Sequence, residues 1–220
     1  MDQPAPTPIQ PPDPNTSAHE RVYRTLRGRI MAGGMEPGVA LALRGIGREF
    51  DLSMTPAREA VRRLAAEGAL TLSSSGRVTT PDLSPERIEE LAALRALIEV
   101  ELASRALPRA HLALIDRMQA INNAISDAVI HRDAVSYIRT NLEFHRTLSL
   151  RAQAPAMLAM AETVWLQMGP TMRALYGRLR RSEPPQYHRL IIAALKAGDE
   201  PGLRLAVRSD VTQGLRMLAG

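Results

Sequence analysis

The chain has 220 residues, of which 45% are hydrophobic and 3% aromatic, and its formal net charge is +5. It contains no cysteine, which excludes disulfides, thiolate metal sites and thiol catalysis. No apolar run reaches the roughly 18 residues needed to span a bilayer, and the N-terminus lacks the features of a signal peptide. The composition therefore predicts a soluble, cytoplasmic, largely helical protein without a membrane partner, and its basic charge permits an anionic one.

The first segment, residues 1–17, is rich in proline and is predicted to be a disordered tail, because it buries too little apolar surface to offset the entropy of ordering. Residues 18–80 carry ten arginines against six acidic residues. In that segment, apolar residues recur every four positions from His19 to Ala32, which predicts an amphipathic helix. A second short helix is predicted from Leu43 to Phe50.

A third helix is predicted to begin with Thr55 as its N-cap, followed by Pro56, and to end at Gly68. Its apolar residues share one stripe and its arginines point elsewhere. The second and third helices are joined by a tight turn, which is typical of a helix-turn-helix. Residues 69–72 and 78–80 can pair as two strands of a hairpin, and this hairpin would form a wing.

Residues 81–84 interrupt the pattern and are predicted to be a linker. Beyond them, residues 85–220 show helical patterns without an intervening strand, at about 85–106, 108–131, 133–152, 155–178, 184–197 and 200–218. The predicted fold is mainly α: an N-terminal winged helix-turn-helix of three helices and a small β-hairpin, followed by an all-α bundle of six to seven helices. Cofactor and metal sites of such bundles lie between facing helices.

The N-terminal segment resembles the winged helix-turn-helix of GntR-family transcriptional regulators. The matching residues are Val22, Tyr23, Thr25, Leu26, Arg27, Ile30, Gly33, Pro37 and Gly38, then Thr55, Pro56, Arg58, Glu59, Ala60, Arg62, Arg63, Leu64, Glu67 and Gly68. The second segment resembles the FadR-type (FCD) subfamily. There the matching residues are Leu94, Arg95 and Glu99, then Asn141, Phe144 and His145, then His188, Ala193, Ala197, Gly198 and Asp199.

The resemblance implies a DNA-binding surface in residues 18–80. It assigns DNA contact to Arg44, Thr55, Arg58 and Gly76, and the neighbouring Arg62 and Arg77 complete the predicted interface. An arginine one turn into a recognition helix can donate two hydrogen bonds from its guanidinium group to guanine, or it can contact a phosphate. The alternative is that these arginines form a solvated helix face with surface ion pairs.

The resemblance also maps four residues of the second segment, Asn141, His145, His188 and Asp210, onto the metal ligands of the subfamily. The usual set there is one Asp and three His; in this chain Asn141 replaces the Asp and Asp210 replaces the last His. Two nitrogen and two oxygen ligands still suit a divalent metal such as Zn²⁺, Ni²⁺ or Mn²⁺. The alternative is that both histidines are ordinary core or surface residues in a pocket that has lost its metal.

The leading hypothesis is a homodimeric transcription factor that binds a palindromic double-stranded operator and a small carboxylate effector. Arg95 is the candidate contact for the effector carboxylate, although it can equally pair with Glu99. The homodimer follows from the resemblance alone, since no self-association pattern is visible. Two other functions remain open: a metal-dependent hydrolase built around the histidines, and an architectural DNA-binding protein without an effector.

Overall fold

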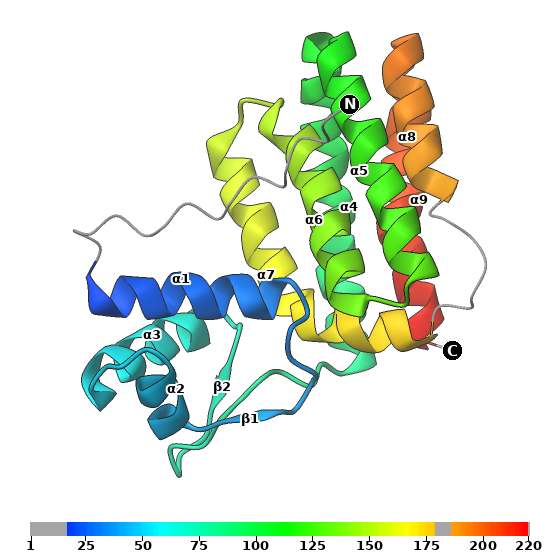
Figure 1. Ribbon diagram of the computed structural model, residues 1–220. Coiled ribbons are helices and arrows are strands. Elements are labelled where there is room, and N and C mark those ends of the chain that lie inside the picture. Colours follow the sequence, from blue (N-terminus) through cyan, green and yellow to red (C-terminus); the bar gives the residue numbers. More distant parts are fainter. Residues whose placement is uncertain (1–16, 179–185, 220) are drawn as a thin grey trace.

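The computed structural model describes residues 17–178 and 186–219, and these ranges are mainly helical with one small sheet. Figure 1 shows the N-terminal elements at the base of the molecule and the long helices of the bundle above them. The predicted fold class is confirmed. The predicted tail, apart from Ser17, lies outside the described residues, as does the predicted start of the fifth bundle helix at residue 184.

The N-terminal part contains three helices and three strands: α1 (Ala18–Met31), β1 (Ala40–Leu41), α2 (Leu43–Glu49), α3 (Met54–Ala66), β2 (Thr71–Leu72) and β3 (Val78–Thr79). Its core forms where the apolar stripe of α1 packs on that of α3. Val22, Leu26 and Ile30 of α1 are fully buried, and so is Leu64 of α3. The four-residue spacing read from the sequence therefore marks the face that this helix buries.

The prediction that Thr55 caps the third helix is wrong. The helix begins one residue earlier, at Met54, and Ser53 occupies the N-cap position with extended backbone angles. Thr55 is exposed in the first turn. Pro56 is compatible with this start because the first backbone N–H groups of a helix have no partner within it, so a proline there removes no helical hydrogen bond. The predicted role of Gly68 at the helix end is confirmed: α3 ends at Ala66, Glu67 is the C-cap, and Gly68 follows with a positive φ of 72°.

The predicted hairpin is present, but the sheet has a third strand. Its order is β1-β3-β2, all antiparallel, with Leu41 opposite Val78 and Thr71 opposite Thr79. A two-residue strand such as β1 has no sequence pattern that distinguishes it from a loop. At the tip of the hairpin, Gly76 adopts a φ of 80°, a backbone conformation that favours glycine.

The bundle consists of α4 (Pro85–Ala106), a 3₁₀ turn (Leu107–Arg109), α5 (Leu112–Ile130), α6 (Ala134–Leu150), α7 (Pro155–Arg178), α8 (Gln186–Ala197) and α9 (Glu200–Ala219). Its main core lies between α4, α5, α6, α8 and α9, and α7 covers α4 and α6. The predicted helix at 108–131 starts later than expected. The side chain of His111 accepts a hydrogen bond from the backbone N–H of Leu114 and caps α5, whereas Pro108 lies in the 3₁₀ turn.

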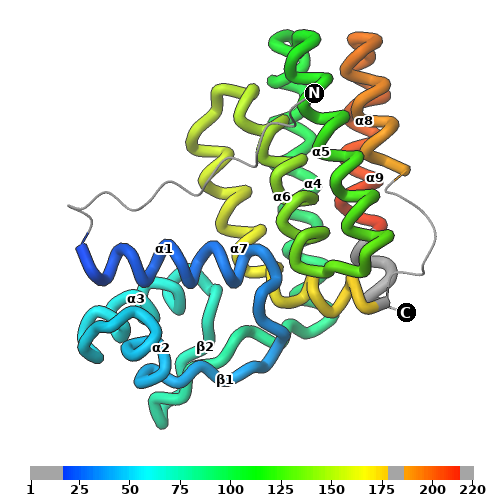
Figure 2. The backbone as a smooth tube through the Cα atoms, in the orientation of Figure 1, coloured from blue at the N-terminus to red at the C-terminus, as the bar shows by residue number. Residues whose placement is uncertain are grey.

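Helix α7 joins the two parts of the molecule. Figure 1 and Figure 2 show that it descends beside α6 and then bends sharply near the C-terminal end of α1. Pro170 lies inside the helix, where its ring removes a backbone hydrogen bond and produces a kink.

None of the helices that the structure describes is long and apolar enough to cross a membrane.

Candidate functional site

The six residues predicted to contact DNA all lie on the surface of the N-terminal part. Arg44 is on α2, Thr55, Arg58 and Arg62 are on α3, and Gly76 and Arg77 are in the turn between β2 and β3; all six are exposed. The structure thus places them on the helix-turn-helix and its wing.

The arginines of this surface differ from others in the same part of the chain. Within the described residues, none of the four arginines predicted to contact DNA (Arg44, Arg58, Arg62 and Arg77) forms an ion pair, whereas Arg24, Arg29 and Arg63 are each paired with a glutamate. Arg63 also stacks on the ring of Tyr23 at 3.6 Å. The alternative that these arginines form a solvated helix face with surface ion pairs therefore applies to Arg63 but not to Arg58, although both residues are on α3. Unpaired guanidinium groups are available to phosphates and guanine edges.

Arg48 is a candidate that the sequence prediction missed. It lies four residues after Arg44 on α2 and is exposed, so the two side chains share a face. Arg48 too forms no ion pair with the part of the chain that the structure describes. Its spacing from Arg44 was a signal in the sequence, but the residue alone could not be distinguished from an ordinary surface arginine.

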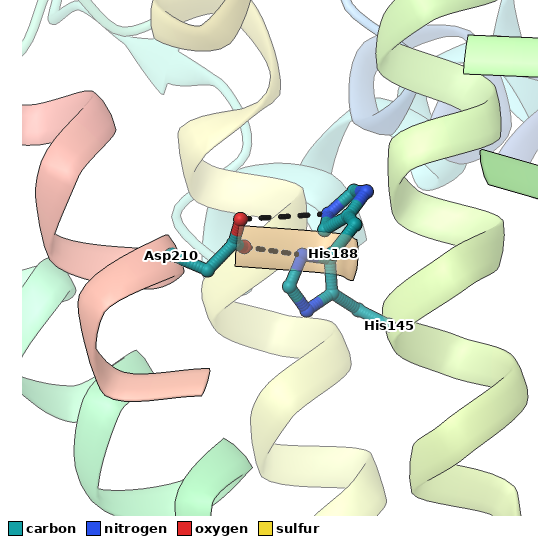
Figure 3. A group of neighbouring side chains, drawn as sticks. All are labelled: His145, His188 and Asp210. Carbon is teal, nitrogen blue, oxygen red and sulfur yellow. Dashed lines mark ion pairs between the residues drawn. The ribbon is translucent and has the colours of Figure 1, made fainter. Parts of the chain in front are cut away.

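The bundle contains a cluster of His145, His188 and Asp210, contributed by α6, α8 and α9 (Figure 3). One ligand atom from each lies within 4.8 Å of the others. The Asp210 carboxylate is 3.1 Å from His145 Nε2 and 3.5 Å from His188 Nε2. The structure therefore brings together three of the four predicted metal ligands.

Burial and hydrogen bonding show how unusual these histidines are. His188 is 0% exposed and its ring stacks on Phe144 at 3.9 Å. Neither of its ring nitrogens has a well-formed hydrogen bond to the described residues, and His145 Nε2 has none either, although the Asp210 carboxylate lies 3.1 Å away. Buried polar atoms are normally hydrogen-bonded. Two imidazoles and one carboxylate also form a donor set that suits a divalent metal, so the residues present fit such an ion.

Glu99 of α4 lies behind the cluster, and the sequence prediction named it only as a possible partner of Arg95. Its carboxylate is 2.8 Å from His145 Nδ1 and accepts hydrogen bonds from Arg95 Nε at 2.6 Å and Trp165 Nε1 at 2.8 Å. A carboxylate on Nδ1 fixes the orientation of the imidazole and directs Nε2 toward Asp210. Glu99 is thus the residue that positions His145.

The charges of this region are strongly coupled. Burial alone would lower the pKa of His145, but the carboxylates of Glu99 and Asp210 outweigh it and raise the pKa to about 9. Burial alone would raise the pKa of Glu99, but Arg95 and His145 hold it well below its usual range. Two occupants can satisfy the cluster chemically: a proton on His145, or a divalent cation between the two imidazoles and Asp210.

Asn141, the fourth predicted metal ligand, lies one turn before His145 on α6 and lines an adjoining small cavity of about 20 Å³. This volume has room for about one water molecule. The polar residues of the cavity wall are Arg95, Asn141 and His145, and the apolar ones are Met31, Ile138, Leu142, Trp165, Met168 and Met172. The candidate effector residue Arg95 is therefore paired with Glu99 and also faces the cavity.

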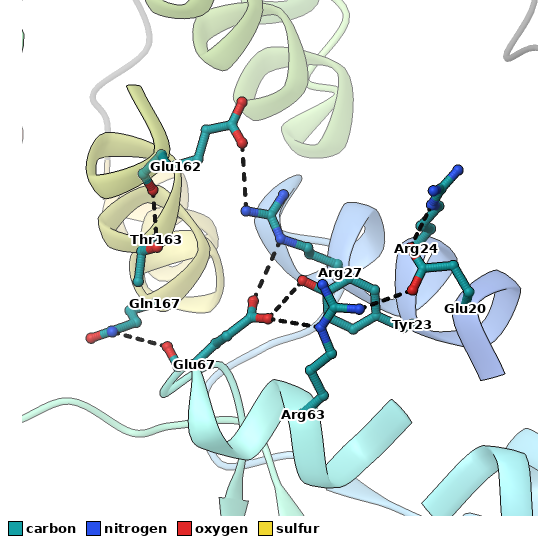
Figure 4. Close-up of polar contacts among 10 residues, drawn as sticks. Glu20, Tyr23, Arg24, Arg27, Arg63, Glu67, Glu162, Thr163 and Gln167 are labelled. Carbon is teal, nitrogen blue, oxygen red and sulfur yellow. Dashed lines mark hydrogen bonds and ion pairs between the residues drawn. The ribbon is translucent and has the colours of Figure 1, made fainter. Parts of the chain in front are cut away.

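A polar network connects the N-terminal part to α7 (Figure 4). Glu67, which follows α3, accepts a hydrogen bond from Tyr23 of α1 at 2.7 Å and is 3.6 Å from Arg27. Arg27 also lies 3.7 Å from Glu162 of α7, and Gln167 of α7 donates to the backbone carbonyl of Glu67 at 3.0 Å. The end of α3 is thus linked to the bundle through α7.

Comparison with known proteins decides the family. Residues 18–79 match the family model "Bacterial regulatory proteins, gntR family", and residues 90–213, more than half of the chain, match the FCD domain. The chain belongs to the GntR family and carries an FCD domain. This GntR-family protein is therefore a DNA-binding transcriptional regulator, and the matched families and named relatives are regulators rather than enzymes.

Several relatives of this regulator are known over most of its length. It is 27% identical to the HTH-type transcriptional regulator McbR of Escherichia coli, covering 90% of this chain and 91% of McbR, and 29% identical to the gluconate operon transcriptional repressor of Bacillus subtilis, covering 81% and 76%. The solved structure of E. coli McbR/YncC superposes with a TM-score of 0.84 at 25% identity, covering 93% of this chain and 98% of that one.

Proposed function

We propose that this regulator binds its operator through α2, α3 and the wing, using Arg44, Arg58, Arg62 and Arg77, with Thr55 and Gly76 at the phosphate backbone. The observation that carries this proposal is the group of four exposed arginines on one part of the fold that form no ion pair with residues 17–178 and 186–219. Residues 18–80 are the DNA-binding unit, residues 81–84 the linker, and residues 85–220 the effector unit. Because its target is genomic DNA, the protein acts in the cytoplasm.

Replacing Arg58 by Ala tests this interface. If Arg58 reads a base, the change costs about 1–3 kcal/mol of binding free energy and relaxes specificity at one operator position. If it contacts a phosphate, affinity falls for all sequences and the salt dependence decreases by about one unit. Fluorescence anisotropy with a duplex selected by the wild-type protein from a random library distinguishes the two.

Arg24→Ala is the matched control, because it removes the same charge from the same part of the protein but from an arginine that is already paired with Glu20. Its expected effect on DNA affinity is small. Unchanged affinity and specificity in Arg58→Ala would contradict the assignment of α3 as the recognition helix.

We further propose that a homodimer binds a palindromic operator. Leu94 and Leu97 of α4 are exposed, Leu97 to 64%, and offer an apolar face to a second copy. Light scattering should give twice the mass of one chain, and Leu97→Glu should reduce it to that of one. Leu112→Glu, at an exposed leucine of α5, is the control and should remain dimeric. A wild-type protein with the mass of one chain would contradict the proposal.

We also propose that His145, His188 and Asp210 hold a divalent metal, Zn²⁺, Ni²⁺ or Mn²⁺, with Asn141 on the side of the cavity. The unpartnered nitrogens of the two buried histidines support this proposal. Such an ion would supply positive charge near Arg95, and the two positive groups together would favour a small carboxylate effector.

Metal analysis by plasma mass spectrometry tests this site. The purified protein is expected to contain about one metal ion per chain. His188→Ala is expected to lose this ion, because His145 and Asp210 alone bind a metal weakly. His131→Ala is the control, since this exposed histidine follows α5 and its Nδ1 lies 2.8 Å from the backbone carbonyl of Asp127, away from the cluster. A metal-free protein, even after incubation with Zn²⁺, Ni²⁺ and Mn²⁺, would mean that a proton on His145 holds the cluster together.

A further inference from the structure

The recognition helix α3 carries one large apolar side chain that is exposed to water. Met54, its first residue, is 36% exposed, whereas Val61 and Leu64 of its apolar stripe are at most 1% exposed. The turn before α3 is anchored by other residues, since Phe50 and Leu52 pack against the core of the DNA-binding part. Packing within the described residues thus leaves over a third of Met54 exposed at the start of the helix.

Met54 lies on the same face of α3 as two of the arginines predicted to contact DNA. Arg58 follows four residues later and Arg62 four residues after that, so the three side chains form one row along the helix. Arg63 is not in this row: it points toward α1, where it pairs with Glu20 at 2.9 Å (Figure 4). The row therefore begins with an apolar side chain at the N-terminal end of α3 and continues with two cations.

The N-terminal end of a recognition helix is the end that contacts base edges in the major groove. A methionine there has no hydrogen-bond donor and only a weak acceptor, so it gains little from a phosphate or from the polar edge of a base. The C5-methyl group of thymine is the apolar feature that the major groove presents. Contact between the two removes apolar surface from water, and the flexible thioether chain adapts to the position of the methyl group.

From this row we propose that Met54 is a specificity-determining residue that reads a thymine of the operator through its C5-methyl group. This inference rests on the proposed function, because it requires α3 to enter the major groove. Met54 and Arg58 are about 6 Å apart along the helix axis, and stacked bases are about 3.4 Å apart. The thymine therefore lies within about two base pairs of the position that Arg58 contacts.

Replacing single thymines by uracil tests this contact, because uracil lacks only the methyl group and keeps every hydrogen bond of the base pair. The duplex is the one that the wild-type protein selects from a random library, and affinity is measured by fluorescence anisotropy. At least one thymine is expected to lose about three- to fivefold in affinity when replaced, the cost of one buried methyl group. A scan in which no thymine depends on its methyl group would overturn the proposal.

Met54→Ala assigns the methyl dependence to this side chain. Affinity for the unmodified duplex is expected to fall several-fold, and the uracil replacement that weakens binding of the wild type is expected to have no effect on the variant. Val39→Ala is the matched control: Val39 is 42% exposed and lies before β1 rather than on α3, so affinity and the uracil effect should both be retained. A full uracil effect in Met54→Ala would refute the inference.

Met54→Arg tests the same contact by a change of preference. An arginine donates two hydrogen bonds to O6 and N7 of guanine and gains nothing from a methyl group. Selection from a random library with this variant is therefore expected to give guanine where the wild type selects thymine. If Met54 had only a structural role, the selected base would stay the same, and that result would contradict the inference.

Failure of this inference can be distinguished from failure of the proposed function. If Arg58→Ala weakens operator binding while no uracil replacement does, α3 remains the recognition helix and only the contact of Met54 with thymine is rejected. If Arg58→Ala and Met54→Ala both leave affinity and specificity unchanged, the proposed interface itself is wrong, and the inference fails with it.

Discussion

Replacing Glu99 by Gln should lower the free energy of unfolding by about 3–5 kcal/mol, the usual cost of removing one partner from a buried ion pair. Glu99 is 3% exposed and Arg95 is 7% exposed, so the guanidinium left behind has little access to water. His145 also loses the carboxylate that lies 2.8 Å from its Nδ1. Urea unfolding followed by circular dichroism and by the fluorescence of the single Trp165 measures the change.

Helix α4 offers a matched control two residues away. Glu101 pairs with Arg105 at 2.8 Å with the same four-residue spacing as Glu99 and Arg95, but both side chains are about half exposed. Glu101→Gln should therefore cost less than about 1 kcal/mol, because water screens the pair in the native state and solvates the arginine that remains. Equal losses in the two variants would show that Glu99 does not hold the charges of the cluster together.

Much of the fold could be predicted from the sequence because its signals are local. The spacing of Val22, Leu26 and Ile30 predicts a helix and also the face that it buries, and Gly68 marks the end of α3 by its backbone conformation. The N-cap of α3 was predicted two residues too late, because Ser53 and Thr55 are both residue types that favour the N-cap position. The exposed arginines could be named for the same reason, since the periodicity of α3 places Arg58 and Arg62 outside its apolar stripe.

The candidate site in the bundle could be predicted only in part. The resemblance named His145, His188 and Asp210, which come from three helices and could not be grouped by spacing within any one of them. It did not reveal that Glu99 contacts His145, or that Met31 reaches the cavity, because these contacts join residues 46 or more positions apart. The kink of α7 was equally hidden, since Pro170 lies in an otherwise continuous helical pattern and its consequence depends on what packs there.

Replacing Gly169 by Ala should destabilise the protein by about 3 kcal/mol, at the upper end of the usual cost of overpacking. An added Cβ would overlap the carbonyl oxygen of Ile30, and it would lie 2.8 Å from the carbonyl carbon of Ile30 and 3.0 Å from the Cα of Met31. These are backbone atoms of α1, which cannot rotate away as a side chain can. The close contact of α1 with the kinked part of α7 therefore requires a residue without a side chain at this position.

Gly177→Ala, on the same helix, should instead raise the free energy of unfolding. Gly177 is exposed, and a Cβ there would meet no atom of the described residues within 4 Å, so alanine should stabilise α7 by about 0.5–1 kcal/mol through its higher helix propensity. The same urea titrations compare the two variants, and the sign of the difference separates packing at the α1–α7 junction from the general effect of removing a glycine from a helix. If Gly169→Ala also stabilised the protein, α1 would not be held against α7 by this contact, and Met31 could move independently of the bundle.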